Sequence, residues 1–367
     1  MPFEINQDME NPSLFSKKTK YKIKVIGVGG AGNNAIQRMV RKGIDDVSLI
    51  AANTDVQVLE INDSPFKLQI GKKLTRGLGA GGDPEKGRQS AIESKEDIAK
   101  YLEGTDLLFI TAGLGGGTGT GSAPIIASIA TEMKILTVAI VTTPFHFEGS
   151  AKEKIALDGL HKLKQCVDSL IKISNDKLLD SGEDIPIAEA FEKADEILYQ
   201  AITGISDLIT KPGMVNVDFA DVESVLKIKG SAMLGIGFAR GEHRAETAIN
   251  NALNSKLLED QVKNANAALV NIAGKNPTTG DVKIISEILR SHAIDDANLK
   301  TGISIIDLPD DEIKVTVVAS GYDKLPGEDN YTELYEQPAL FRQFGKTILA
   351  DEISKLNKYL AEIEEDE

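Results

Sequence analysis

The stretch Gly115–Gly121 limits what this chain can fold into more than any other, because its five glycines and two threonines cannot build a hydrophobic core. An apolar run, Leu107–Ile110, precedes it, and a segment that is predicted to be a helix, Ser122–Met133, follows it. Glycines at a strand-to-helix turn let backbone N–H groups, hydroxyls and a helix N-terminus come close to an anion. The stretch therefore predicts a phosphate-binding turn.

Predicted strands and helices alternate through the first half of the chain. This alternation indicates a doubly wound, largely parallel α/β sheet. In such sheets ligands bind beyond the carboxyl ends of the strands, where the glycine-rich turns fall. The predicted strands are Tyr21–Ile26, Val47–Ala52, Leu107–Ile110 and Ile135–Thr142, and the predicted helices are Asn33–Lys42, Pro84–Leu102 and Ser122–Met133.

Apolar residues spaced by three and four predict one long helix over Ala188–Thr210. Beyond it we expect a smaller α/β domain, with strands at Met233–Phe238, Ala268–Ile272, Ile303–Leu308 and Ile313–Ala319 and helices at Arg244–Leu253 and Val282–Ala293. The expected order is an N-terminal arm (1–20), a nucleotide-binding domain (21–187), the central helix (188–212), a loop with its following helix (213–229), the smaller domain (230–321) and an acidic tail with an amphipathic helix (322–367).

The chain of 367 residues has a formal net charge of −15. That charge disfavours nucleic acid and anionic membranes as direct partners, since both are bound through a basic surface. No apolar run approaches the roughly 18 residues of a membrane span, and the polar residues 1–20 contain no secretory signal. The single cysteine, Cys166, cannot form an internal disulfide. Together these features predict a cytoplasmic protein.

Two further glycine-rich loops are expected at the same edge of the sheet. Gly27–Gly32 has the G-x-G-x-x-G spacing after a strand, which by itself suggests a nicotinamide-dependent oxidoreductase with Asp55 as its ribose-binding acid. Gly79–Gly82 lies ahead of Asp83 and Pro84, a typical helix start. Three loops suit a triphosphate better than the shared pyrophosphate of a dinucleotide.

The chain has neither a P-loop motif nor an Asn-Lys-x-Asp guanine motif.

Several motifs, in the same order along the chain, resemble the tubulin/FtsZ family of GTPases, and FtsZ in particular. Besides Gly115–Gly121, they are Val25–Asn34, Ala52–Asp55, Pro144–Gly149 and Asn216–Val222. The likeness extends from about residue 21 to about residue 320. It implies a protein that binds GTP and GDP and forms head-to-tail homopolymers at the cell-division site, assisted by tether and regulator proteins.

The resemblance also implies roles for individual residues. It assigns Glu148 to the ribose, and Asn175 and Asp195 to the guanine base, with Phe191 packed on the ring. Lys152 stands where the family often has an arginine, and it keeps the charge but not the planar guanidinium. The implied phosphate ligands are Gly29, Gly30 and Asn34 for the α- and β-phosphates, Ala80, Gly81 and Gly82 for the γ-phosphate, and Gly113, Gly115, Gly116, Gly117, Thr118, Gly119, Thr120 and Gly121 for the main phosphate turn.

The assignment of Asp195 and Phe191 also has a chemical basis. A carboxylate can accept from both the N1–H and the exocyclic amine of guanine, a donor pair that adenine lacks. Phe191 lies four residues earlier, on the same face of the predicted helix. The residues alone leave a second interpretation open, in which Phe191 is an ordinary core residue and Lys152 is a solvated helix position.

Asp218 and Asp221 are the predicted catalytic pair, and the residues alone allow two interpretations. Asp218 could simply cap a short helix that contains Asp221. Alternatively, both carboxylates orient and polarise a water molecule for attack on the γ-phosphate. The resemblance implies that they act in trans with Asn216 and complete the nucleotide site of the neighbouring subunit. Mg²⁺ would be held by phosphate oxygens and water, without a metal cage in the protein.

Two other functions stay open at this point. One is the NAD-dependent oxidoreductase, for which the chain offers no catalytic constellation of histidine, lysine or tyrosine. The other is a nucleotide-binding scaffold that polymerises without useful hydrolysis. In the acidic tail, Gln337–Arg342 faintly resembles the terminal peptide with which FtsZ chains dock on membrane tethers.

Overall fold

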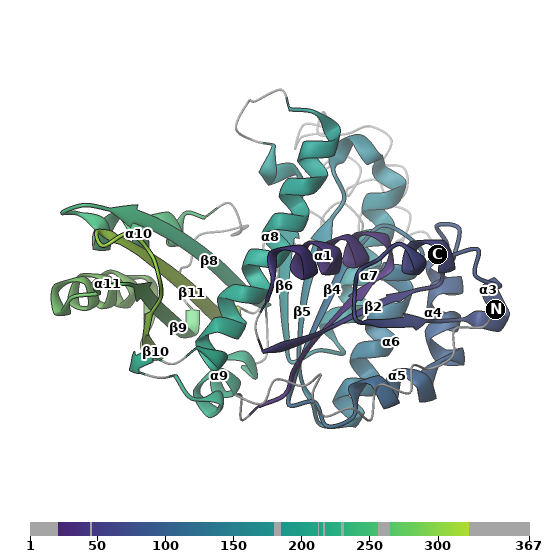
Figure 1. Cartoon of the computed structure of the whole chain (residues 1–367), viewed down its shortest axis with the longest axis horizontal. Coiled ribbons are helices and arrows are strands. Elements are labelled where there is room, and N and C mark those ends of the chain that lie inside the picture. Colours follow the sequence, from purple (N-terminus) through teal and green to yellow (C-terminus); the bar gives the residue numbers. More distant parts are fainter. Residues whose placement is uncertain are drawn as a thin grey trace, which may run out of the picture. The chain divides into compact units, whose positions relative to one another are not determined.

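The structure is a computed structural model that describes residues 21–44, 46–179, 185–211, 213–215, 217–228, 231–255 and 265–322. The expected N-terminal arm and nearly all of the acidic tail, including Gln337–Arg342, lie outside these residues, as do Pro212 and Asn216. The described strands join into one hydrogen-bonded sheet in the order β3-β2-β1-β4-β5-β6-β8-β11-β9-β10-β7 (Figure 1).

Six parallel strands form the first part of this sheet. They are β1 (Ile23–Val28), β2 (Val47–Asn53), β3 (Phe66–Gln69), β4 (Leu107–Gly113), β5 (Leu136–Thr143) and β6 (Ser169–Ser174). The central strand β1 pairs with β2 on one side and with β4 on the other, so Val25 lies between Leu49 and Phe109. The central strands are largely apolar because both faces of a parallel sheet are covered by helices.

Helices α1 (Gly29–Lys42) and α8 (Ile187–Thr210) pack on one face of the parallel sheet (Figure 1). Ile36 and Met39 of α1 and Ile202 of α8 are fully buried in the core between these helices and the strands. On the other face, α6 (Thr118–Glu132) and α7 (Ser150–Lys164) contact the strands, and α4 (Pro84–Glu93) and α5 (Lys95–Leu102) pack on α6. The predicted doubly wound α/β fold is therefore confirmed.

The strand order creates a topological switch point between β1 and β4. After β1 the chain runs outward to β2 and β3, whereas after β4 it runs the other way to β5 and β6. The turns that leave β1 and β4 therefore diverge, which opens a crevice at the carboxyl ends of these two strands. Both turns are glycine-rich segments, Gly29–Gly32 and Gly113–Gly119.

The long helix α8 leads from the parallel sheet to the second part of the molecule (Figure 1). Its 24 residues extend about 36 Å. The buried residues recur every three to four positions, so they lie on one face of the helix. They include Leu198, Ala201, Ile202, Ile205 and Leu208.

The second part of the sheet belongs to the smaller α/β domain. It contains β7 (Gly213–Val215), β8 (Ser231–Arg240), β9 (Ala265–Gly274), β10 (Ala293–Ile305) and β11 (Glu312–Tyr322). Strand β11 is antiparallel to β8 and β9, β10 is parallel to β9, and β6 meets β8 through the pair Leu170 and Ser231. Helices α10 (Arg244–Leu253) and α11 (Thr279–His292) pack on these strands, and α9 (Phe219–Leu226) follows β7 in the chain.

Some element boundaries differ from the sequence prediction. The predicted helix Pro84–Leu102 is two helices, because Ser94 leaves helical geometry (φ −99°, ψ 16°), and its hydroxyl accepts from the Gly71 N–H at 2.9 Å. The helix after the glycine stretch begins at Thr118 and not at Ser122. Strand β10 begins at Ala293, well before Ile303. Helices α2 (Val56–Glu60) and α3 (Lys72–Thr75) and strands β3, β6 and β7 have no counterpart in the prediction, which placed Lys152 on a helix but gave no bounds for α7.

Glycines allow α4 and α6 to approach each other more closely than side chains would permit. A Cβ atom on Gly121 would lie 1.9 Å from the Pro84 carbonyl oxygen, and one on Gly87 would lie 2.3 Å from the Gly117 carbonyl oxygen. The Ser122 hydroxyl donates to the Gly87 carbonyl at 2.8 Å across the same contact. Part of the glycine stretch is therefore required for helix packing.

We expect Gly121→Ala to destabilise the fold, because the added methyl group overlaps backbone that cannot move without displacing α4. The free energy of unfolding should fall by about 2 kcal/mol, which is typical of an overpacked site. Gly30→Ala is the matched control, since Gly30 also lies in the first turn of a helix but an added Cβ meets nothing within 4 Å. Thermal and urea unfolding without nucleotide measure the difference, and equal stability of the two variants would contradict the prediction.

Candidate functional site

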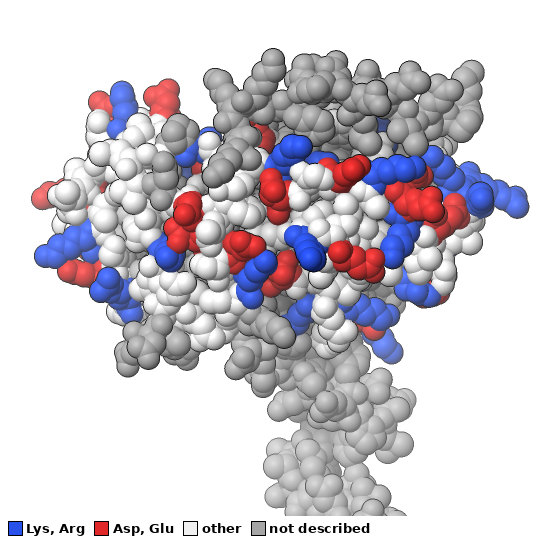
Figure 2. Space-filling view, turned by 90° about the horizontal axis from the view of Figure 1, so that it is seen from below, with Lys and Arg blue, Asp and Glu red and all other residues white. Residues whose placement is uncertain are grey.

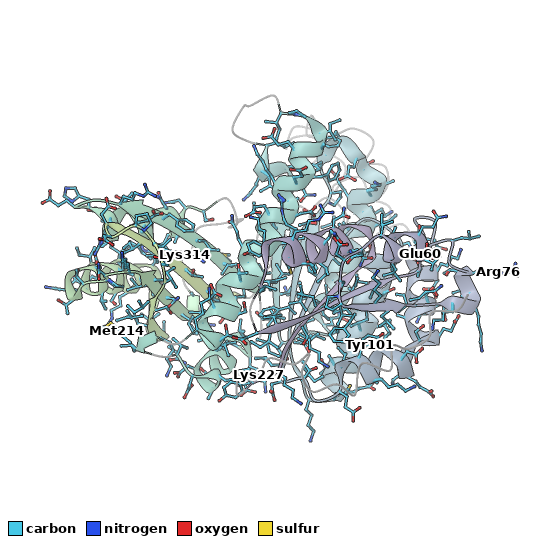
Figure 3. The ribbon with its side chains drawn as sticks, viewed as in Figure 1. Glu60, Arg76, Tyr101, Met214, Lys227 and Lys314 are labelled. Carbon is cyan, nitrogen blue, oxygen red and sulfur yellow. The ribbon has the colours of Figure 1, made fainter. Side chains whose placement is uncertain are left out.

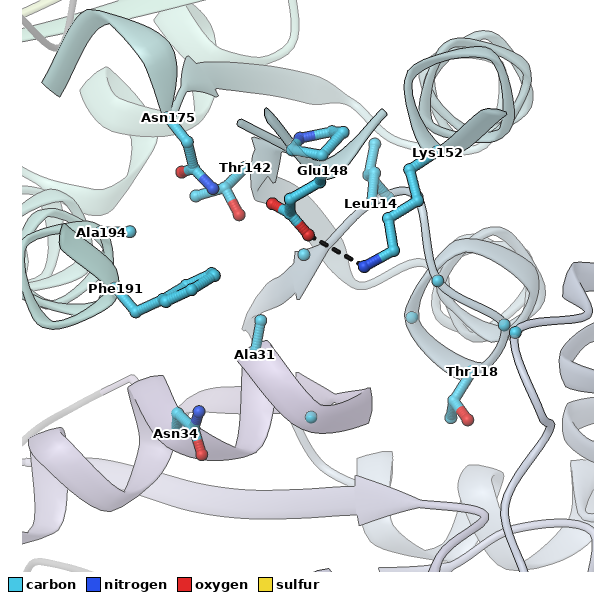
Figure 4. A pocket seen from close by; sticks show the side chains of 18 of the residues that line it. Ala31, Asn34, Leu114, Thr118, Thr142, Glu148, Lys152, Asn175, Phe191 and Ala194 are labelled. Carbon is cyan, nitrogen blue, oxygen red and sulfur yellow. Dashed lines mark hydrogen bonds and ion pairs between the residues drawn. The ribbon is translucent and has the colours of Figure 1, made fainter. Parts of the chain in front are cut away.

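A cavity of about 290 Å³ opens at the switch point, beyond the carboxyl ends of β1 and β4 (Figure 4). All of the nucleotide-binding residues predicted above line it, except Gly29, Thr120 and Gly121. The lining residues are Gly30, Ala31, Asn34, Ala80, Gly81, Gly82, Gly113, Leu114, Gly115, Gly116, Gly117, Thr118, Gly119, Thr142, Pro144, Glu148, Lys152, Asn175, Phe191, Ala194, Asp195 and Leu198.

At one end of the cavity, glycines keep space open in front of the backbone. A Cβ atom added to Gly30, Gly81, Gly82 or Gly116 would meet no other atom within 4 Å. Gly81 and Gly82 also have positive φ angles, 63° and 79°, which side chains rarely tolerate. These four residues come from all three glycine-rich loops, so the loops together leave room for a ligand that contacts backbone N–H groups.

The two helices that begin at this end of the cavity have no capping side chain. The N-cap residues of α1 and α6 are Val28 and Gly117, and neither provides a side-chain hydrogen bond. In contrast, Asp55, Asp83 and Asp218 cap α2, α4 and α9 by accepting from backbone N–H groups. The first N–H groups of α1 and α6 and the positive ends of their dipoles are therefore available to an anion.

The three predicted residues that do not line the cavity hold its wall together. The Thr120 hydroxyl accepts from the Gly115 N–H at 2.9 Å and so fixes the turn after β4. Gly121 lies against α4, as described above. Gly29 has φ 74°, and a Cβ there would lie 2.8 Å from the Gly119 nitrogen, so it lets the α1 and α6 turns pack together.

A buried asparagine network supports the turn after β1, and the sequence reasoning did not assign it. Asn33 donates through Nδ2 to the Gly27 carbonyl at 2.8 Å and to the Ala52 carbonyl at 3.1 Å. Asn53 in turn donates to Asn33 Oδ1 at 3.0 Å. The network ties the ends of β1 and β2 together, and it explains why the motifs Val25–Asn34 and Ala52–Asp55 each contain an asparagine.

At the other end of the cavity, Glu148 and Lys152 form an ion pair in which Lys152 Nζ lies 3.0 Å from Glu148 Oε2 (Figure 4). The second carboxylate oxygen of Glu148 accepts from the Phe145 N–H at 3.0 Å. Glu148 extends from the short helical segment after β5, and Lys152 extends from the start of α7. Lys152 thus lies in the cavity wall and is not merely a solvated helix position.

The aromatic ring of Phe191 extends from α8 into the cavity, opposite Asn175 and above Asn34 in Figure 4. Phe191 remains 42% exposed, so it is not a core residue in this structure. Its ring meets the buried ring of Phe145 edge-on, with centroids 5.2 Å apart. The ring is therefore held in place and offers a face on which a planar ligand can pack.

Asp195 and Asn175 bring side-chain oxygen atoms to the wall of the cavity. Burial raises the pKa of the Asp195 carboxyl to about 7, with a further increase from Glu192 and an opposing effect of Arg38. Asn175 Oδ1 is buried and has no hydrogen-bond partner among the residues described. Buried groups of this kind normally have partners, so Asn175 Oδ1 is placed to accept a hydrogen bond from a ligand in the cavity.

Six lining residues were missed by the sequence reasoning: Ala31, Leu114, Thr142, Pro144, Ala194 and Leu198. Ala31, Leu114, Ala194 and Leu198 lie next to, or one helical turn from, a predicted residue, and Pro144 belongs to the motif Pro144–Gly149. Thr142 reaches the cavity because it pairs with Gly113 across the sheet, which no signal in the sequence reveals. Asp55, the acid that the dinucleotide interpretation requires, does not line the cavity. Its carboxylate caps α2 by accepting from the Gln57 N–H at 2.9 Å.

Asp218 and Asp221 lie outside the cavity, at the start of α9. Asp218 Oδ1 accepts from the Asp221 N–H at 2.7 Å, so Asp218 is a helix cap, as one of the two interpretations proposed. Asp221 forms an ion pair with Lys300 at 2.7 Å. Asn216, the third residue of this predicted group, lies outside the described residues.

Comparisons with known proteins identify the family. Residues 22–183 match the model of the tubulin/FtsZ family GTPase domain, and residues 230–323 match that of the FtsZ family C-terminal domain. An empty FtsZ dimer from M. jannaschii is 43% identical, covers 86% of this chain and 92% of its own, and has a TM-score of 0.79. A mutant FtsZ from the same organism gives 43% identity, 84% and 93% coverage and a TM-score of 0.78.

More distant structures share only the fold. The GTPγS-bound protofilament of CetZ2 from Haloferax volcanii is 23% identical, covers 85% of this chain and 96% of its own, and has a TM-score of 0.71. Both the family prediction and the predicted nucleotide-binding and smaller domains of the fold are thus confirmed. The chain belongs to the tubulin/FtsZ family of GTPases and carries both the GTPase domain and the C-terminal domain characteristic of FtsZ.

Proposed function

We propose that this protein binds GTP in the switch-point cavity and hydrolyses it within head-to-tail protofilaments that form the cell-division ring. The observation that carries the proposal is the separation of two incomplete sites. The cavity holds the predicted phosphate- and base-binding residues but not the predicted catalytic carboxylates, which lie at the start of α9. Two copies stacked end to end would bring them together.

The base end of the cavity favours guanine. The Asp195 carboxylate can accept two hydrogen bonds from the N1–H and the exocyclic amine, and the Asn175 amide can contact the same ring. Phe191 offers its ring to the face of the base. Adenine has no matching donor pair, so it would leave Asp195 buried without hydrogen bonds, which is unfavourable.

The length of α8 supports catalysis in trans. Asp195 lies at the cavity, and the helix continues for about 22 Å to Thr210 before the chain enters β7 and α9. Large apolar side chains are exposed both near the start of α9 and close in the chain to cavity residues. Met214 (74%) and Val215 (48%) precede α9, whereas Leu78 (81%) and Phe147 (58%) lie within two residues of cavity residues in the chain. A second copy of the chain would cover both groups.

At such a contact, Asp218 and Asp221 would act on water and not on phosphate directly. A carboxylate 4 Å from a phosphate oxygen is repelled by about 4 kcal/mol at an effective dielectric constant of 20. A water molecule or cation therefore separates the two, and the carboxylates orient and polarise the attacking water. Asn216 is proposed to assist them.

Mg²⁺ is expected with the nucleotide, where it would neutralise charge that develops on the phosphate oxygens. Within the described ranges, no group of three or more His, Cys, Asp or Glu side chains is placed to hold a metal ion. Eight of the 22 lining residues are glycines, and only two of the 22, Glu148 and Asp195, carry a carboxylate. The residues therefore fit an ion that is held by phosphate oxygens and water, which Mg²⁺ often prefers.

We further propose that the protein works in the cytoplasm beneath the membrane and reaches the division site through tether and regulator proteins. Figure 2 shows acidic and basic side chains interspersed over one face, without a broad basic patch among the residues coloured there. None of the described helices combines the length and the apolar composition of a membrane span. Direct binding to nucleic acid or insertion into lipid is not proposed.

GTP turnover should rise steeply with protein concentration, because each active site needs two subunits. Phosphate release and light scattering after addition of GTP measure hydrolysis and assembly together, and ATP is the control nucleotide. A constant turnover per subunit from dilute to concentrated protein would count against the proposal.

Asp221→Ala should lower GTP turnover at least 100-fold while leaving GTP binding intact, because the carboxylate is proposed to act only on the next subunit. Glu223→Ala is the matched control, since it removes another carboxylate of α9, one that pairs with Lys227 at the C-terminal cap of this helix. Turnover and nucleotide affinity are measured for both. Unchanged turnover in Asp221→Ala filaments would favour the non-hydrolysing scaffold instead.

GTP affinity should rise with pH and level off above about 7, the pKa of the Asp195 carboxyl. The donors of guanine stabilise the ionised carboxylate, so binding lowers this pKa and releases a proton at lower pH. Asp195→Asn should lower affinity about 100-fold, since hydrogen bonds to a charged group contribute roughly 1.5–3 kcal/mol each. Calorimetry at several pH values compares the GTP affinity of the two proteins. Because the variant has no carboxyl at position 195, its pH profile reports the titration of the nucleotide phosphates alone. Identical pH profiles would refute the assignment.

A further inference from the structure

A lysine of the smaller domain lies beside the predicted catalytic pair. Lys300 of β10 places Nζ 2.7 Å from Oδ1 of Asp221 on α9. In β10, Lys300 pairs with Leu269 of β9, and the preceding residue, Leu299, packs against the core of the smaller domain. Since successive side chains of a strand point to opposite faces, Lys300 is directed away from that core and reaches α9.

The ammonium group of Lys300 pairs with one of two linked carboxylates. Asp218 and Asp221 are linked by the N-cap hydrogen bond of 2.7 Å. The hydrogen bond between Lys300 and Asp221 lowers the pKa of Asp221 and raises the pKa of Lys300, and the charge of Asp218 makes a smaller contribution to the rise at Lys300. Among the ion pairs of the described residues, only Lys300 joins a cation to either aspartate. The start of α9 therefore presents two negative charges and one positive charge.

We propose that Lys300 is a positioning residue for GTP hydrolysis, which holds the Asp221 carboxylate in place and offsets its charge when α9 meets the nucleotide of the next subunit. The inference rests on the proposed function, because it assumes that Asp221 acts in trans. Without the ammonium group, two uncompensated carboxylates would approach a polyphosphate, and their repulsion would oppose both docking and a fixed water position.

A purely structural role makes a different prediction. Lys300 and Asp221 are 37% and 32% exposed, and ion pairs at such positions contribute little to stability. If the ion pair between Lys300 and Asp221 only stabilised the packing of α9 against β10, removing it would lower the melting temperature slightly and leave GTP turnover unchanged.

The test compares Lys300→Gln and Lys300→Arg with the matched control Lys227→Gln. Lys227, labelled in Figure 3, forms an ion pair of 2.6 Å with Glu223 on the same helix α9, and the two side chains are 51% and 36% exposed. GTP turnover of the full chain is measured against protein concentration, which separates the saturating rate from the concentration at which assembly begins. Melting temperatures report folding.

We expect Lys300→Gln to lower the saturating turnover about tenfold and to raise the concentration needed for assembly. Lys300→Arg should retain most of the turnover, because it keeps the charge, and Lys227→Gln should match the unmodified protein. In an Asp221→Asn background, Lys300→Gln should cause no further loss, since its partner is already neutral. Turnover of Lys300→Gln equal to that of Lys227→Gln would overturn the positioning role.

Asp221→Asn, assayed alone, separates this inference from the proposed function. If it loses turnover while Lys300→Gln does not, the aspartate is catalytic and only the role of Lys300 is wrong. If Asp221→Asn turns over GTP normally, catalysis in trans by Asp221 is refuted, and the inference about Lys300 falls with it.

Discussion

The site depends on two helix N-termini that the protein itself leaves without caps. Each uncapped terminus carries backbone N–H groups that lack a partner, and such groups are costly unless water or a ligand binds them. Glycines such as Gly30 and Gly116 keep side chains out of the space in front of them. Other described helices, among them α5, α8 and α10, also lack a side-chain cap, so what distinguishes α1 and α6 is that both begin at the glycine-lined end of the cavity. An anion that binds there completes the hydrogen bonding of the fold.

The central helix α8 links the cavity to the segment that leads into α9. Near its start, Phe191 and Asp195 line the cavity, and further along, Ile202 and Ile205 are fully buried in the main core. Because these residues belong to one rigid, buried element, the base-binding groups cannot move independently of the sheet. The same rigidity keeps the start of α9 away from the cavity of its own subunit, so under the proposed function the carboxylates of α9 would complete only the site of a neighbouring subunit.

The sequence predicted the sheet, the long helix and the family, because these depend on apolar periodicity and on glycine motifs that have few structural solutions. It did not predict the short elements. Strand β3 has four residues and α3 has four, too few for a period to show, and Ser94 interrupts a helix through a tertiary bond to Gly71. The cavity was largely predicted, whereas the Asn33 and Asn53 network was not, since buried amide contacts leave no periodic signal.

Capping by Asp218 and catalysis by the same residue do not exclude each other. The cap uses Oδ1, and Oδ2 accepts no hydrogen bond within the described part of the chain. A capped carboxylate is also held in one rotamer, which is what orientation of a water molecule requires. The cap further places the Asp221 backbone, and hence its side chain, in a fixed relation to Asp218. Helix capping by Asp218 is therefore a requirement for the proposed catalysis, because a mobile pair of carboxylates could not hold water in line with a phosphate.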